Sequence, residues 1–405
     1  MAGGVRVGRR SYSGSFFAAY FFYYAGYCVF SSFIVPYLTQ RGVSATLCGI
    51  ITSLTLAANL LMEPAGGYIT DTFCSTQRYL LACIGLISIL CLFSTLWADY
   101  PLVCMALLIL EAGLAYPFSQ LMDAWVEGSR SLDPDLVYSR VRAGGSVGFA
   151  AASMAAGYCF RRFGWDGYFL MQAALFCLMI PWLLRLPKLK LGNQRQKCQA
   201  EQWLSPKTAF QVALRNIRYL VCLLLCTLYW FSHRPVGSYL SLIIQERSGD
   251  AGVYGAVCGV GAAVECAALL VLAAAQRRHP ISNWLCLGGA LFTGLLRPLC
   301  LWLLPGLWPL YLGQGLQSIS FAFFYSGSVA CFTRTSDERI RSFSISMGLT
   351  VSSVVGTIAA NLLGGWLCDW LGAWSMVNLS LVVSAGNGGL FLICWYLLLR
   401  DDRSG

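Results

Sequence analysis

Two oppositely charged residues, Asp123 and Arg142, lie within neighbouring apolar segments that a short polar link joins. Charged side chains inside a membrane segment are costly, and they persist mainly where they pair, line a wet cavity or bind something polar. A carboxylate and a guanidinium form charge-assisted hydrogen bonds, which suit a solute that carries hydroxyl groups. We therefore predict that Asp123 and Arg142 form the core of a substrate-binding site.

A simpler interpretation of these charges is that they mark the cytoplasmic ends of two membrane helices. Arginine side chains near a helix end can extend to lipid headgroups, and acidic residues often stand beside them. We assign this role to Glu127 and Arg140, which lie next to the link. We keep the binding role for Asp123 and Arg142, because each of them lies deeper in its segment.

Three more ionisable residues inside apolar segments are candidates for carrying a proton. Glu265 stands among alanine, valine and cysteine, where poor solvation favours the neutral acid, and it could also bind solute or make a structural pair. His233 is the only histidine within a predicted span, and either proton exchange or packing explains it. Glu111, in LLILEAGLAYPF, either carries a proton or makes a helix contact.

The first apolar segment is crowded with aromatic residues, which suit the apolar face of a sugar ring or another flat polar solute. Most of them are expected to contact lipid or to form an interface belt. Tyr23, Tyr27 and Phe30 follow one another at helical spacing, so these three are the candidates for lining a cavity.

The composition is that of a polytopic membrane protein. Of the 405 residues 57% are hydrophobic and 11% are charged, against a charged share of about 25% in soluble proteins. The apolar runs have the length that a helix needs to cross a bilayer core of about 30 Å. We predict an all-α protein with twelve transmembrane helices, near residues 15–39, 46–71, 79–97, 102–127, 140–160, 165–186, 219–244, 252–275, 282–304, 307–332, 343–368 and 373–399.

The predicted segments group into two bundles of six helices, 15–186 and 218–399. A basic N-terminal lead, 1–14, precedes the first bundle, and a short tail, 400–405, follows the second. Residues 187–217 form a hydrophilic cytoplasmic linker that contains a short amphipathic stretch, which we expect to lie as a helix on the membrane surface.

The distribution of basic residues sets the orientation. With the N-terminus inside, 21 of the 28 lysine and arginine residues fall in cytoplasmic segments and four in outer ones, which predicts that both termini are cytoplasmic. The net charge of +10 then follows from the topology and needs no nucleic-acid partner. The first apolar run is full length and is followed by further spans, which argues against a cleavable signal peptide.

Cysteines are numerous, 18 in all, but nearly all of them lie inside apolar runs. No CxxC motif and no Cys/His ligand spacing occurs in the sequence. We interpret the cysteines as small apolar packing residues and predict neither a metal site nor a cofactor.

Motifs of the first half resemble those of the major facilitator superfamily. In EPAGGYITDTFCSTQRYLL, the residues Gly67, Asp71 and Arg78 are similar to the loop signature that follows the second helix of that family. The aromatic first segment ending in PYL, the DAWVE segment and YSRVRAGGSVGFA occur in the same order as in the oligosaccharide:proton symporter branch, which includes lactose permease. The resemblance implies two six-helix bundles around a central polar cavity, with a conformational latch at the loop signature.

The resemblance also implies roles for individual residues. In that branch, an acidic residue on the fourth helix and an arginine on the fifth hold substrate hydroxyls, and these positions correspond to Asp123 and Arg142. Phe149 stands nearest to an aromatic residue that stacks on the sugar. A glutamate on the eighth helix contacts substrate, and an arginine on the ninth takes part in proton coupling, which implies that Glu265 and Arg297 are partners.

The tenth segment departs from this pattern. Gln314, Gln317 and Ser320 occur in the segment where lactose permease has ionisable residues. A member of a charge pair left alone in the membrane would be costly, so the joint loss of such pairs is physically consistent. The proton route is therefore open among Glu265, Glu111 and His233.

These observations predict a secondary active transporter in the plasma membrane. It would carry a small polar solute, such as a sugar, an oligosaccharide or a nucleoside-like compound, as a monomer and by proton symport through alternating access. A proton-independent facilitator or an exporter of the same fold is the alternative. A membrane enzyme is disfavoured because the sequence lacks HExxH, GxSxG and glycine-rich phosphate motifs. A receptor that transports nothing would leave the buried charges of both halves unexplained.

The charge distribution gives a direct test of topology. A reporter fused after Ala200 is expected to be active only in its cytoplasmic form, because the linker carries the largest group of basic residues. A fusion that reports an outer location for Ala200 would contradict the predicted orientation.

Overall fold

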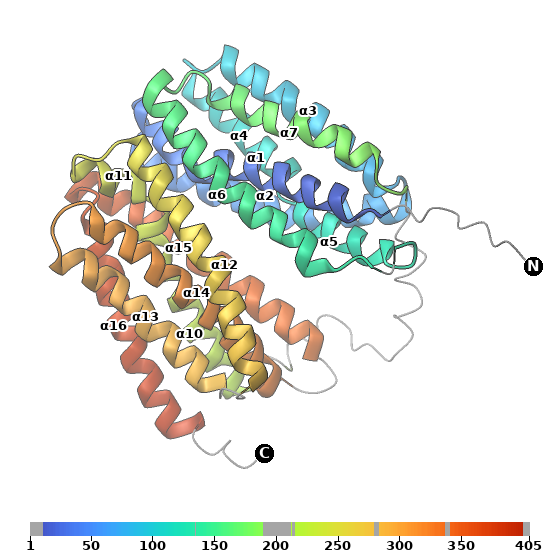
Figure 1. Ribbon diagram of the computed structural model, residues 1–405. Coiled ribbons are helices and arrows are strands. Elements are labelled where there is room, and N and C mark those ends of the chain that lie inside the picture. The colour runs from blue at the N-terminus through green and yellow to red at the C-terminus, as the bar shows by residue number, and fades with distance from the viewer. Residues whose placement is uncertain are drawn as a thin grey trace, which may run out of the picture. The chain divides into compact units, whose positions relative to one another are not determined.

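The computed structural model describes residues 11–133, 135–188, 212, 215–278, 283–336 and 341–399. These residues form helices and no strand, which confirms the predicted all-α class (Figure 1). Most of the N-terminal lead, nearly all of the linker with its predicted amphipathic helix, and the C-terminal tail lie outside the described residues.

Seven helices precede the linker and seven follow it in the described chain (Figure 1). The first group is α1 Ser13–Gln40, α2 Ala45–Thr72, α3 Thr76–Leu96, α4 Pro101–Ala115, α5 Phe118–Ser129, α6 Tyr138–Phe163 and α7 Tyr168–Leu184. The second group is α10 Ile217–Ser238, α11 Leu240–Glu246, α12 Ala251–Arg278, α13 Asn283–Leu303, α14 Trp308–Thr335, α15 Arg341–Leu371 and α16 Ser375–Cys394, followed by the π-helical turn η2 Trp395–Leu399.

Each predicted segment coincides with one of these helices or with two consecutive elements. The segment 102–127 is divided between α4 and α5 next to Pro117, which has no N–H group to continue the helical hydrogen bonds. The segment 219–244 is divided at Tyr239, four residues after Pro235. Pro117 thus lies at the boundary between α4 and α5, and Pro235 lies in the last turn of α10.

Nine helical segments of the described chain are long and apolar enough to cross a membrane, with α4 and α5 counted as one. The predicted number of twelve is therefore not established. The predicted spans outside the nine are those of α6, α7 and α14. Four arginines interrupt α6, α7 has 17 residues, and α14 is rich in glutamine and serine.

The chain divides into two compact units. Unit 1 comprises Met1–Ile34, Leu54–Ala156 and Arg162–Glu201, and unit 2 comprises Val35–Ser53, Gly157–Arg161 and Gln202–Gly405. The end of α1, the beginning of α2 and a short piece of α6 thus belong to unit 2. The bundle limits 15–186 and 218–399 remain a prediction.

In unit 1, α6 lies against the backbone of α1. A Cβ atom at Gly144 would be 2.4 Å from the carbonyl oxygen of Phe17, and one at Gly148 would be 2.2 Å from that of Phe21. Glycines four residues apart form a flat helix face that allows such a close approach inside a membrane. These glycines of the AGGSVGF sequence therefore bring Arg142, on the same helix, close to α1.

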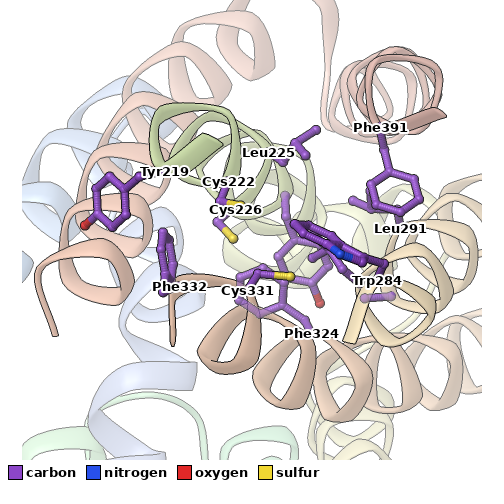
Figure 2. Packing of buried hydrophobic residues seen from close by; sticks show 13 residues of the cluster. Tyr219, Cys222, Leu225, Cys226, Trp284, Leu291, Phe324, Cys331, Phe332 and Phe391 are labelled. Carbon is purple, nitrogen blue, oxygen red and sulfur yellow. The ribbon is translucent and has the colours of Figure 1, made fainter. Parts of the chain in front are cut away.

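Unit 2 has a hydrophobic core built by α10, α13, α14 and α16 (Figure 2). The core includes Tyr219, Cys222, Leu225 and Cys226 of α10, Trp284 and Leu291 of α13, Phe324, Cys331 and Phe332 of α14, and Phe391 of α16. Its cysteines have free thiols and fill space between aromatic rings, as the sequence interpretation proposed.

Also within unit 2, a residue near the end of α15 completes the first turn of α2. The Asp369 carboxylate accepts hydrogen bonds from the backbone N–H groups of Ala45 and Thr46, both at 2.8 Å, and from the Thr46 hydroxyl at 2.5 Å. The first N–H groups of a helix have no intrahelical partner, and the positive end of the helix dipole favours a carboxylate. Gly365 makes this approach possible, since a Cβ there would lie 2.5 Å from the Ala45 carbonyl oxygen.

The contact of α6 with α1 predicts a stability difference between two glycine substitutions. Gly148→Ala is expected to destabilise the protein by roughly 1–3 kcal/mol, because the added methyl group must displace α1. Gly85→Ala in α3 is the control, since no atom lies within 4 Å of the position that its Cβ would take. Thermal unfolding of the purified proteins in detergent measures both. Equal unfolding temperatures of the two variants would contradict the proposed contact.

Candidate functional site

Asp123 and Arg142 are both hydrogen-bonded to tyrosines of α1 in unit 1. The Tyr20 hydroxyl donates to Asp123 Oδ1 at 2.5 Å, and Arg142 Nη2 donates to the Tyr24 hydroxyl oxygen at 2.6 Å. The Tyr24 hydroxyl also shares a hydrogen bond of 2.7 Å with Ser119 Oγ. We call these five residues the tyrosine cluster. The structure thus brings the two predicted site residues together, through side chains that the sequence interpretation did not select.

The charges of the tyrosine cluster interact without a direct ion pair. Asp123 and Arg142 lie within electrostatic reach of each other, but each forms its hydrogen bond with a tyrosine. The Arg142 guanidinium carbon is 4.3 Å from the centre of the Tyr24 ring and 5.7 Å from that of Tyr20. Such cation–π contacts stabilise a charge by about 2 kcal/mol when it is shielded from water. Both ions are therefore stabilised while most of the guanidinium N–H groups are left for another acceptor.

The tyrosines that contact the two charges, Tyr20 and Tyr24, were not among the residues predicted to line a cavity. Tyr20, Tyr23 and Phe30 are all buried, with 0%, 2% and 1% of their surface exposed, so burial does not distinguish the two faces of α1. Tyr20, Tyr24 and Tyr27 share a face at spacings of four and three residues. This spacing was present in the sequence, but the Tyr23–Phe30 stripe has the same period, and periodicity alone does not choose between them.

Tyr27 lies beside the tyrosine cluster. Its ring centre is 6.0 Å from that of Tyr24 and 5.5 Å from that of Tyr116. Phe149 is partly buried and stands seven residues after Arg142, which places it two turns along the same face of α6. Both residues therefore have positions compatible with the aromatic roles predicted for them.

Glu127 and Arg140 lie outside the tyrosine cluster. Glu127 is exposed and forms an ion pair of 3.0 Å with Arg130, one turn away on the same helix end. Arg140 is also exposed. These positions agree with the simpler interpretation, in which both residues mark helix ends.

A second polar group surrounds Arg297 in unit 2. Arg297 is 2% exposed, and it donates to the His233 carbonyl oxygen at 3.1 Å and to Gln314 Oε1 at 3.2 Å. The predicted partner, Glu265, is not one of these two acceptors. Two neutral acceptors already satisfy part of the guanidinium, and a neutral amide on α14 takes the place of an acid.

Glu265 lies on α12, half-buried, one turn after the contact of α12 with α14. That contact is close because Gly261 faces Gln314, whose side chain would lie 3.0 Å from an added Cβ, and because Ser318 Oγ donates to the Gly261 carbonyl. Glu265 also lies within electrostatic reach of Tyr229. Glu265 and Arg297 thus lie in the same unit, and the interactions described for each of them are with other residues.

Aromatic rings surround the side chain of His233. Its ring stacks on Tyr229 with centres 5.3 Å apart, and Trp230 lies edge-on at 6.2 Å. The next residue, Arg234, is exposed and places its guanidinium 4.9 Å from the centre of the Trp230 ring. This arrangement is consistent with the packing role for His233 that the sequence left open beside proton exchange.

Glu111 is fully buried in unit 1, where it accepts hydrogen bonds from Gln172 and Cys91. Gly67 and Asp71 lie in the last turns of α2, and Arg78 is exposed in the first turn of α3. The latch role of these three residues remains a prediction. Within the described ranges, no three His, Cys, Asp or Glu residues are grouped as metal ligands.

Comparison with known proteins agrees with this architecture. The sequence matches the MFS_1 like family over residues 15–378. The uncharacterized transporter YwbF of Bacillus subtilis (strain 168) is 19% identical over 375 residues, which are 91% of this chain and 88% of YwbF.

Several solved transporters have a similar fold. A variant of the nucleoside transporter NupG has a TM-score of 0.82 at 15% identity, over 96% of this chain and 100% of NupG. A POT family transporter in complex with 5-aminolevulinic acid has a TM-score of 0.72 at 14% identity, over 96% of each chain. A bacterial homologue of the human lysosomal transporter Spinster has 0.67 at 15%, over 98% and 99%. The chain therefore belongs to the MFS_1-like family and is a multi-pass membrane transporter of the major facilitator superfamily, not an enzyme.

Proposed function

We propose that the chain is a secondary active transporter of a small solute rich in hydroxyl groups, from the sugar, oligosaccharide or nucleoside class. The observation that carries this proposal is that Asp123 and Arg142 are each bound to a tyrosine hydroxyl rather than to one another. A carboxylate and a guanidinium in this arrangement can accept and donate charge-assisted hydrogen bonds to a neutral polyol. The solute then does not have to break a strong ion pair to bind.

The aromatic residues of the same unit favour a solute with a flat or ring-shaped part. The Tyr20 and Tyr24 rings are nearly parallel, with an interplanar angle of 12° and centres 6.5 Å apart, and Tyr27 follows on the same face. Aromatic faces bind sugar rings and nucleobases while their hydroxyl groups keep polar partners. The fold shared with the nucleoside transporter NupG supports including nucleosides in this class.

For the mechanism we propose proton symport by alternating access, with Glu265 as the first candidate for coupling. A half-buried carboxylate can alternate between a neutral acid and an ion, and an arginine in the same unit can stabilise the ion. In this role Arg297 would exchange its present neutral acceptors for Glu265 in another state of the cycle. Glu111 and His233 are the next candidates, and Gly67, Asp71 and Arg78 would form the latch.

One observation favours a second candidate function, a facilitator or exporter that does not use protons. Arg297 already has two neutral acceptors, so its charge does not require a titrating acid as a partner. The remaining parts of the proposal are twelve spans, two six-helix bundles, a monomer, and a plasma-membrane location with both termini in the cytoplasm.

Substitutions in the tyrosine cluster test the binding site. Arg142→Ala is expected to weaken solute binding about tenfold to 150-fold, because a hydrogen bond to a charged group contributes about 1.5–3 kcal/mol. Asp123→Asn should act in the same direction, since it removes the negative charge. Binding is measured on purified protein with a panel of nucleosides, monosaccharides and disaccharides.

Arg140→Ala is the matched control for this prediction. Arg140 stands two residues from Arg142 on the same helix but is exposed, so its removal should leave the affinity unchanged. If Arg142→Ala retains wild-type affinity for the solute that the panel identifies, the binding site does not include the tyrosine cluster.

Transport in proteoliposomes tests the coupling residue. Glu265→Gln is expected to retain exchange of solute across the membrane and to lose accumulation driven by a proton gradient, because only the charge-changing step is removed. Glu127→Gln, at an exposed acid that pairs with Arg130, should retain both activities. Unchanged accumulation in Glu265→Gln excludes Glu265. If uptake by the wild-type protein does not change with the proton gradient, the protein has the proton-independent function instead.

A further inference from the structure

Three buried side chains meet between α3, α4 and α7 of unit 1, apart from the tyrosine cluster. They are Cys91, Glu111 and Gln172, and each has 0% of its surface exposed. Gln172 Nε2 donates a hydrogen bond to Glu111 Oε1, and Cys91 Sγ donates to the same oxygen at 3.6 Å. A carboxyl group is thus fully enclosed, with a carboxamide directly beside it.

Two oxygen atoms of this group are left without a partner among the described residues. They are Glu111 Oε2 and Gln172 Oε1, one from each member of the carboxyl–carboxamide pair. Both atoms are acceptors if Glu111 is ionised, so an ionised pair leaves a buried negative oxygen and a buried amide oxygen unsatisfied. Leaving such groups unpaired costs about 1–3 kcal/mol for a neutral acceptor and more for a charged one.

A single proton on Glu111 gives both unpaired oxygen atoms a hydrogen-bond partner. A carboxylic acid and a primary amide form two parallel hydrogen bonds, one from the amide N–H to the carbonyl oxygen and one from the acid O–H to the amide oxygen. The first of these bonds is present between Gln172 and Glu111. The second would join the two atoms that otherwise have no partner.

Among the described residues, no charged group that would favour the ionised form interacts with Glu111. The neighbours that interact with Glu111 are the thiol of Cys91 on α3 and the amide of Gln172 on α7, and Cys177 of α7 lies near Cys91. No arginine or lysine of the described chain forms an ion pair with Glu111. A carboxylate without a cation in a dry site is strongly disfavoured.

We infer that Glu111 is a neutral carboxylic acid and that the Glu111–Gln172 pair is a proton-binding site, in which the bound proton bridges Glu111 Oε2 and Gln172 Oε1. The proton joins α4 to α7 by a second hydrogen bond. The site requires neither solute nor a transmembrane gradient, so the inference does not rest on the proposed symport.

Infrared spectroscopy of the purified full-length protein tests this site, in a detergent without ester or carboxyl groups. At neutral pH, the wild-type spectrum should contain a C=O band of a protonated carboxylic acid that shifts in D₂O and is absent from Glu111→Gln. The substitution should be tolerated, because two amides can form the same pair of hydrogen bonds. Loss of carboxylate bands in Glu111→Gln, with no loss of a carboxylic acid band, would overturn the inference.

Two further variants make the assignment specific. Glu127→Gln, at the exposed acid paired with Arg130, should lose only carboxylate bands. Gln172→Met keeps Glu111 but removes the amide, so the carboxylic acid band should remain and move to higher frequency as its C=O loses a donor. An unshifted band in Gln172→Met would show that the proton is not shared with the amide, which would overturn the inference. This variant also provides a test if Glu111→Gln does not fold.

Discussion

The arrangement of this transporter depends on the cost of placing an ion in a medium that does not solvate it. The deeply placed charges that the structure describes in detail are attached to polar groups of other helices, as Asp123 is to Tyr20 and Arg142 is to Tyr24. Arg297 follows the same rule with a backbone carbonyl and an amide. In each case a neutral group stabilises the charge, so the charge remains able to change partners.

These hydrogen bonds between side chains of different helices require helices that lie close together, and glycine makes this possible. Gly148 allows α6 to touch the backbone of α1, and Gly261 does the same for α12 and the Gln314 side chain. At Gly356 of α15, an added Cβ would lie 2.6 Å from the Thr227 carbonyl oxygen of α10, so these two helices also pack closely.

Features that depend on a single residue or a continuous run were predictable from the sequence. Apolar runs gave the helices to within a few residues, isolated charges pointed to Asp123 and Arg142, and the resemblance to the major facilitator superfamily pointed to Arg297. The rotation of each helix was not predictable, because Tyr20 and Tyr24 have the same period as Tyr23 and Phe30. The acceptors that Arg297 has in this structure, the His233 carbonyl and Gln314, were overlooked for a related reason. A search for an opposite charge overlooks neutral acceptors such as Gln314, although they stabilise a guanidinium without a second desolvated ion.

The cap that Asp369 places on α2 has a consequence for how the protein is made. Asp369 follows Ala45 by 324 residues, so at ordinary rates of translation the ribosome adds it roughly 16 to 65 s after Ala45. During this interval the first N–H groups of α2 have no Asp369 carboxylate to accept their hydrogen bonds. The first turn of α2 therefore reaches its final structure only after α15 has been synthesised. Although α2 is made early, its beginning is completed late, together with the end of the chain.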